Sequence, residues 1–191
     1  MIERPRRDKP PKSYTDDFIN DSDLQQVEIT MNPIGIVRST YKERFDTPRQ
    51  PALGNEVTAS IELAAGLNLE QATRDLEGFT HIWVIYWMHL NQGWNPTVIP
   101  PRGPKTRRGV LATRAPHRPN SIGLSVVRLL KVEGRRLTIA AHDMLDGTPV
   151  LDIKPYLPYA DAAAEASHGW LEEAGLVPPP PSDQEIDSLT S

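Results

Sequence analysis

One short segment of the chain gathers several side chains that are suited to binding an anion. Residues 109–125 read GVLATRAPHRPNSIGLS. The centre of this segment carries two arginines, a histidine and an asparagine: Arg114, His117, Arg118 and Asn120. Pro116 and Pro119 fix φ and remove two backbone donors, which predicts a stiff loop between two strands. A solvated turn is the alternative, but four such side chains within seven residues favour a binding loop.

A second candidate loop comes earlier, at residues 41–50. Pro48 and Pro51 bracket Arg49 and Gln50 and limit their backbone freedom. The segment is either a surface connection or a rigid loop that offers a guanidinium and an amide to a ligand. The residues alone favour neither interpretation.

A third candidate is the run from Asp146 to Pro149, which reads DGTP. An Asp-Gly pair is a strong turn signal, and the neighbouring positions carry further carboxylates at Asp143 and Asp152. The Asp-Gly pair therefore predicts a turn just before the expected strand at 150–156.

The charge of the chain is strongly segregated. The net charge is −4, yet residues 78–132 contain no Asp or Glu and eight Lys or Arg, so this segment is +8 and the remainder is −12. The basic zone predicts a surface that faces an anion. Trp94 lies in its long loop, 91–106, where it either stacks on nucleic acid or fills the edge of the core. We slightly favour the core position for this one residue.

The hydrophobic pattern predicts a mainly β domain with hairpin-like spacing. The expected strands are residues 34–39, 56–63, 79–90, 122–133, 135–142 and 150–156, with a further strand-like run at 109–113. Asn68 is expected to cap a helix that packs through Leu69, Ala72 and Leu76 and ends at Gly78. A second short helix is expected within 162–175. This pattern indicates a β-barrel or a β-rich α+β domain.

The run 79–90, FTHIWVIYWMHL, is expected to be a central strand because it is apolar on both faces. The tails differ from it in composition. We expect a mobile N-terminal arm at 1–30, a compact domain at 31–165, and a short helix with a Pro-rich, flexible C-terminal tail at 166–191.

Several enzyme classes are disfavoured. There is no cysteine, no G-x-G of a dinucleotide fold, no phosphate-cradling P-loop and no G-x-S-x-G elbow. The five histidines are too scattered to suggest a metal site, so no metal is expected. No apolar run is long enough for a transmembrane helix, and no secretory signal is evident, which is compatible with a reducing, cytoplasmic location.

The motifs RAPHRPNSIGLS (114–125), DGTPVLDIKPY (146–156), PRQP (48–51) and Ile34-Gly35 together resemble the TsaA-like, or TrmO-type, proteins. These are tRNA N6-methyltransferases that act on threonylcarbamoyladenosine beside the anticodon. The resemblance covers about residues 33–161. It implies a compact single-sheet β-barrel, S-adenosylmethionine as cofactor, and a homodimer with its cofactor sites near the subunit interface.

The resemblance also implies site residues. The implied cofactor contacts are Arg49, Gln50, Pro51, His89, Leu90, Arg114, Leu124, Asp146, Gly147, Thr148 and Pro149. Basic residues are expected to contact tRNA, namely Arg102, Lys105, Arg107, Arg108 and Arg118. The general base is left open among Asp146, Arg118, Asn120 and other groups of the 114–120 loop. The rivals are a methyltransferase of the same fold with another substrate, and a non-catalytic module that binds the cofactor or RNA.

Overall fold

The structure is a computed structural model that describes residues 28–43, 46–48, 57–163 and 165–177. The chain divides into residues 1–31 and 32–191, and all the strands described below belong to the second unit. Most of the predicted N-terminal arm and the end of the predicted C-terminal tail lie outside the described residues.

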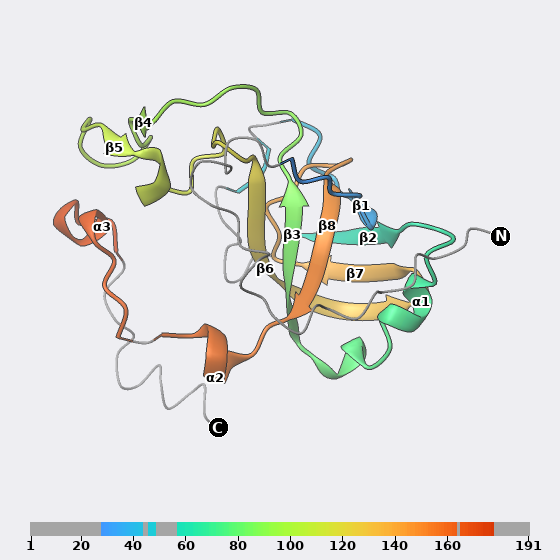
Figure 1. The fold of residues 1–191 in the computed structure, drawn as a ribbon. Helices are drawn as coiled ribbons and strands as arrows, with labels where there is room; N and C mark the ends of the chain where they lie inside the picture. The colour runs from blue at the N-terminus through green and yellow to red at the C-terminus, as the bar shows by residue number, and fades with distance from the viewer. Residues whose placement is uncertain (1–27, 44–45, 49–56, 164, 178–191) are drawn as a thin grey trace, which may run out of the picture. The chain divides into compact units, whose positions relative to one another are not determined.

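Six antiparallel strands form one closed barrel in the order β1-β2-β7-β6-β3-β8 (Figure 1). The strands are β1 (Gly35–Arg38), β2 (Thr58–Leu63), β3 (His81–Trp87), β6 (Ile122–Glu133), β7 (Arg136–Ala140) and β8 (Pro149–Pro155). The sheet closes where Gly35 and Ile36 of β1 pair with Val150 and Pro149 of β8. The prediction of a mainly β, single-sheet barrel is confirmed.

The core fills the barrel with alternate residues from each strand, because successive side chains of a strand point to opposite faces. On β3 the inward residues are Ile82, Val84 and Tyr86, which are all buried. β3 lies between β6 and β8, which makes it a central strand (Figure 1). The hairpin of β6 and β7, with Gly134 at positive φ in its turn, is also as predicted.

The helix expected from Asn68 to Leu76 is wrong in its extent. The structure has a single turn, α1 (Leu69–Ala72), followed by a 3₁₀ turn, η2 (Leu76–Gly78). Asn68 has a left-handed backbone with φ 54° and makes no capping bond. Asp75, with φ 67°, is left-handed as well, and such a residue cannot continue a right-handed helix. Ala72 is exposed, and its neighbour Thr73 is buried instead.

The strand-like run predicted at 109–113 is also corrected. Only Arg108–Gly109 (β5) is extended, pairing with Thr97–Val98 (β4), and a 3₁₀ turn, η3 (Val110–Ala112), follows. The Thr113 hydroxyl donates to the Val110 carbonyl at 2.9 Å and closes this turn. Trp94 is 49% exposed, so its predicted place in the core is wrong.

The short helix predicted within 162–175 is confirmed as the single turn α3 (Trp170–Glu173), and a further single turn, α2 (Pro158–Asp161), precedes it. α3 lies beside the β4–β5 segment (Figure 1), where the Trp170 indole donates to the Ala112 carbonyl at 2.8 Å. Gly169, with φ 55°, separates α3 from the preceding chain. No helix in the described ranges is long and apolar enough to cross a membrane.

We predict that Gly123→Ala destabilises the barrel. A Cβ at this position would lie 2.2 Å from the ring of Tyr86, its partner across β3 and β6, so the strand or the ring must move. Overpacking of this kind costs roughly 1–3 kcal/mol, which urea denaturation measures. Gly109→Ala is the matched control because nothing lies within 4 Å of its Cβ position. Equal stability of the two variants would contradict the close packing of Tyr86 on Gly123.

Candidate functional site

The predicted loops meet at one end of the barrel, where β3 ends and β6 and β8 begin. Trp87 of β3 pairs with Ile122 of β6, and Tyr86 pairs with Val150 of β8. We call this end the barrel mouth; its described residues are 38–43, 88–90, 114–124 and 141–149. It carries every predicted cofactor residue that the structure describes, namely His89, Leu90, Arg114, Leu124, Asp146, Gly147, Thr148 and Pro149. Arg49, Gln50 and Pro51 lie outside the described residues.

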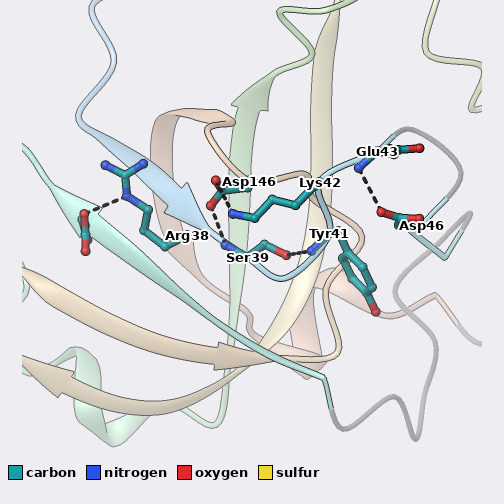
Figure 2. Close-up of polar contacts among 8 residues, drawn as sticks. Arg38, Ser39, Tyr41, Lys42, Glu43, Asp46 and Asp146 are labelled. Atoms are coloured by element: carbon teal, nitrogen blue, oxygen red, sulfur yellow. Dashed lines mark hydrogen bonds and ion pairs between the residues drawn. The ribbon is translucent and has the colours of Figure 1, made fainter.

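Asp146 ties the DGTP turn to the end of β1 (Figure 2). Its Oδ1 accepts the Ser39 backbone N–H at 2.9 Å, and its Oδ2 lies 2.7 Å from the Lys42 ammonium. The Asp146 N–H in turn donates to the Tyr41 carbonyl at 2.8 Å. Gly147 follows with φ 77°, a conformation that favours glycine at this turn. The turn is therefore fixed against β1 by side chain and backbone together.

These contacts determine the protonation of Asp146. Hydrogen bonding from Lys42, then from the Ser39 N–H, holds the pKa of this carboxyl below its usual value. The carboxylate therefore stays ionised, and both of its oxygens are engaged. These contacts suit Asp146 to holding the turn in place better than to accepting a proton. Its predicted role as general base stays a prediction.

A second polar group fills the inner part of the barrel mouth. The Ser125 hydroxyl donates to Asp143 Oδ1 at 2.6 Å, and the Tyr86 hydroxyl lies 3.3 Å from Ser125 Oγ. Since the single Ser125 proton points to Asp143, Tyr86 is the donor in the second bond. Tyr86 and Ser125 are buried, with 8% and 2% exposure. We call Tyr86, Ser125 and Asp143 the polar chain.

The polar chain has perturbed acidities. Burial raises the pKa of Asp143, opposed by the Ser125 hydrogen bond and, more weakly, by the nearby positive charge of Arg114. Burial, and then the Asp143 charge, raise the pKa of Tyr86 to about 12. A carboxyl with a raised pKa beside an arginine at a barrel mouth is a candidate for proton transfer.

His142 packs beside the polar chain and is fully buried. Its Nδ1 accepts the Met144 N–H at 3.3 Å, and its ring lies 5.0 Å from that of Tyr41. Nε2 has no hydrogen-bond partner among the described residues. Burial lowers the pKa of His142, so the ring is neutral at physiological pH and contributes to packing.

The side chain of Arg118 stabilises the 114–120 loop through hydrogen bonds to backbone carbonyls just before it. The Arg118 Nη1 donates to the carbonyls of Thr113 at 2.7 Å and Val110 at 3.2 Å. Arg114 and Asn120 are exposed. The structure gives Arg118 a bracing role in its loop, and its predicted catalytic and RNA-binding roles, like that of Asn120, stay predictions.

The predicted RNA-binding residues divide into two groups. Arg102, Lys105 and Arg107 are exposed in the loop of β4 and β5. The Arg108 guanidinium is half-buried, lies 5.1 Å from the centre of the Trp170 ring and reaches Glu173 at 4.0 Å. The packing of α3 on this loop was not visible in the sequence, which gives no local signal for contacts between residues so far apart.

Apolar side chains are exposed at the barrel mouth. Leu90 is 65% exposed, Leu124 is 55% exposed, and Trp87 and Ile122 are about half exposed beside them. Exposed apolar side chains and the exposed Arg114 guanidinium at the same mouth fit a ligand that combines an aromatic base with a carboxylate. S-adenosylmethionine has this chemistry. Among the described residues there is no group of three metal-ligating side chains placed to hold a metal ion.

A family model described as the tRNA-methyltransferase O N-terminal domain matches residues 36–162. The tRNA (adenine(37)-N6)-methyltransferase of Escherichia coli strain K12 is 45% identical over 148 residues, which are 74% of this chain and 63% of that protein. A probable S-adenosyl-L-methionine-binding protein of Methanothermobacter thermautotrophicus is 42% identical over 139 residues, which are 73% of this chain and 98% of that protein.

The crystal structure of TrmO from Pseudomonas aeruginosa is similar to this structure with a TM-score of 0.67 and 42% sequence identity. The match covers 81% of this chain and 66% of that one. The chain thus spans less than two thirds of the Escherichia coli and Pseudomonas proteins and nearly all of the archaeal one.

Proposed function

The chain belongs to the family of the tRNA-methyltransferase O N-terminal domain, and on that premise we propose that it is an S-adenosylmethionine-dependent methyltransferase. Its proposed substrate is the N6 of threonylcarbamoyladenosine beside the tRNA anticodon. The observation that carries the proposal is the convergence of three separate segments, residues 89–90, 114–124 and 146–149, at one barrel mouth. The name of the Escherichia coli relative supports tRNA as substrate, and that of the archaeal relative supports the cofactor.

We propose that the cofactor binds across these three segments together with Arg49, Gln50 and Pro51. The exposed side chains of Leu90 and Leu124 provide apolar surface for the adenine. Arg114 is suited to pair with a carboxylate, either of the cofactor or of the threonyl group of the substrate. The rigid turn at 146–149 offers backbone groups at a fixed position, because Asp146 is anchored to Ser39 and Lys42.

When bound, the cofactor supplies a methyl group on an already activated sulfonium sulfur. The protein therefore has to align the acceptor nitrogen with that methyl group and exclude water. The urea-type N6 is a poor nucleophile until it loses its proton, so a general base accelerates the reaction.

We propose that the exposed loop of β4 and β5 contacts tRNA. Arg102, Lys105 and Arg107 project from it without an acidic residue in the surrounding segment 78–132. Trp94, three residues before β4, is half exposed and can stack on a base. Action on tRNA is consistent with the predicted cytoplasmic location.

We also propose that two copies of the chain associate through the outer face of β3 and β6. Trp87 and Ile122, which pair directly, and Leu124 expose apolar surface there, at 48%, 40% and 55%. Monomers rarely leave such surface on a sheet uncovered. A symmetric pair would place Leu124, a proposed cofactor contact, beside the interface.

The function is tested by incubating the full chain with S-adenosylmethionine and tRNA that carries threonylcarbamoyladenosine, followed by mass spectrometry of the nucleosides. We expect threonylcarbamoyladenosine to gain one methyl group, and tRNA lacking this nucleoside to gain none. Methylation of another nucleoside would identify a different substrate. Cofactor binding without transfer to any tRNA would identify a non-catalytic module.

The RNA surface is tested by replacing Arg102, Lys105 and Arg107 with alanine together. We expect weaker tRNA binding and a salt dependence reduced by roughly one unit of slope for each lost phosphate contact, with unchanged affinity for S-adenosylmethionine. Arg74→Ala combined with Arg136→Ala is the control, since both are exposed and lie outside this loop. Equal loss of tRNA and cofactor binding would indicate misfolding, and no loss of tRNA binding would place the RNA elsewhere.

The proposed dimer is tested by sedimentation velocity. We expect the chain to sediment as a dimer and Ile122→Asp to sediment as a monomer, because a charge would be buried in an apolar interface. Leu130→Asp, at an exposed position nearer the other end of β6, should remain a dimer. A monomeric wild-type chain, or a dimer that survives Ile122→Asp, would overturn the proposed interface.

A further inference from the structure

We infer that Asp143 is the catalytic residue that contacts N6 and takes its proton, and that Ser125 and Tyr86 are positioning residues for its carboxylate. This inference rests on the proposed function. It assigns the general base to a residue outside the candidates that the sequence favours, Asp146, Arg118 and Asn120.

The location of Asp143 supports this role. Its hydrogen-bond partner, Ser125, directly follows Leu124 on β6, and Asp143 itself precedes Asp146 by three residues. Asp143 thus lies between two of the proposed cofactor segments. Asp143 is partly exposed, whereas Ser125 is 2% exposed. Asp143 is therefore the more accessible of these two members of the polar chain.

The polar chain holds the carboxylate in one orientation. Ser125 Oγ donates to Oδ1 at 2.6 Å, a short bond of the kind that a hydroxyl makes to a charged acceptor. Tyr86 OH supports Ser125 at 3.3 Å. The Tyr86 ring can lie against Gly123 of β6 only because glycine has no side chain. A Cβ at position 123 would lie 2.2 Å from the Tyr86 ring.

The two aspartates of the mouth differ in the way that proton transfer requires. Asp146 is bound by the Lys42 ammonium and the Ser39 N–H, which stabilise its ionised form. Asp143 has no cation within ion-pair distance among the described residues, and burial raises its pKa. A base is more effective as its pKa approaches the working pH, so Asp143 is the better acceptor.

The proposed methyl transfer accounts for every proton, electron pair and charge. The N6–H proton passes to the Asp143 carboxylate, and the N6 electron pair forms the new bond to the methyl carbon. The carbon–sulfur bond breaks with its electron pair remaining on sulfur, so the positive sulfonium becomes the neutral thioether of S-adenosylhomocysteine. Asp143 then releases the proton to water at the mouth.

The burial of Asp143 has a consequence for stability. Because its pKa is higher in the folded than in the unfolded chain, ionisation costs folding free energy as the pH rises through these two values, and costs nothing below them. A residue that costs stability at neutral pH is typical of a functional site.

The test uses Asp143→Asn in the full chain, which keeps the shape and cannot take the proton. We expect methyl transfer to threonylcarbamoyladenosine in tRNA to fall by at least about a hundredfold. Calorimetry should give an affinity for S-adenosylmethionine within twofold of wild type. The melting temperature of the variant should equal or exceed that of wild type at pH 8, and its relative advantage should vanish in acid. Asp75→Asn is the matched control: Asp75 is exposed, directly precedes η2 and has a left-handed φ that asparagine tolerates.

Ser125→Ala gives an independent readout. Loss of its hydrogen bond raises the Asp143 pKa further, so the rate should rise with pH at a higher midpoint than in wild type. An unshifted pH profile, or an Asp143→Asn variant that keeps its rate, overturns the inference while the proposed function stands. A wild-type chain that methylates no tRNA overturns both.

Discussion

The pairing of β1 with β8 is the interaction on which the site depends. Gly35 and Ile36 lie opposite Val150 and Pro149, and this short contact closes the sheet. An open sheet would leave β1 and β8 as separate edges. Closure instead places the chain that follows β1, the loop between β3 and β6, and the turn before β8 around one rim. The contact of Asp146 with Ser39 and Lys42 is possible only because of that closure.

Closure of the barrel encloses an interior whose filling differs between its centre and the mouth. The interior of a small barrel has to be filled by apolar side chains, and Ile82, Val84, Val127 and Ile139 fill it in this chain. At the mouth, however, three polar residues replace that pattern. Tyr86 and Ser125 take inward positions, and Asp143 covers them. The hydrogen bonds between them satisfy the buried hydroxyl groups, but they also bring a carboxylate into a poorly solvated place.

Much of the fold could be predicted from the sequence. The β-branched and aromatic run of β3 and the Gly134 turn between β6 and β7 are local signals, and both indicated the correct strands. The errors arose where local signals conflicted with backbone conformation. Asn68 and Asp75 adopt left-handed angles that shorten the helix, and the run after Gly109 turns where a strand was expected. The docking of Trp170 on Ala112 joins residues far apart in sequence, which no periodicity reveals.

The candidate site could be predicted in part. Its loops are marked by proline, arginine and Asp-Gly signals, and the described ones lie together. The polar chain was missed because a single Ser or Tyr in an apolar strand is a weak signal. The alternation on β6 places Ser125 inward between Gly123 and Val127, and that break in the apolar pattern is the feature that could have revealed it.

A crystal structure of the chain with S-adenosylhomocysteine would decide whether one barrel mouth binds the methyl donor. We expect the ligand at the mouth, where it contacts the turn at 146–149 and at least one of Leu90, Arg114 and Leu124. A ligand at the opposite end, beside the turn between β6 and β7, would contradict it. So would a mouth that stays empty at saturating ligand.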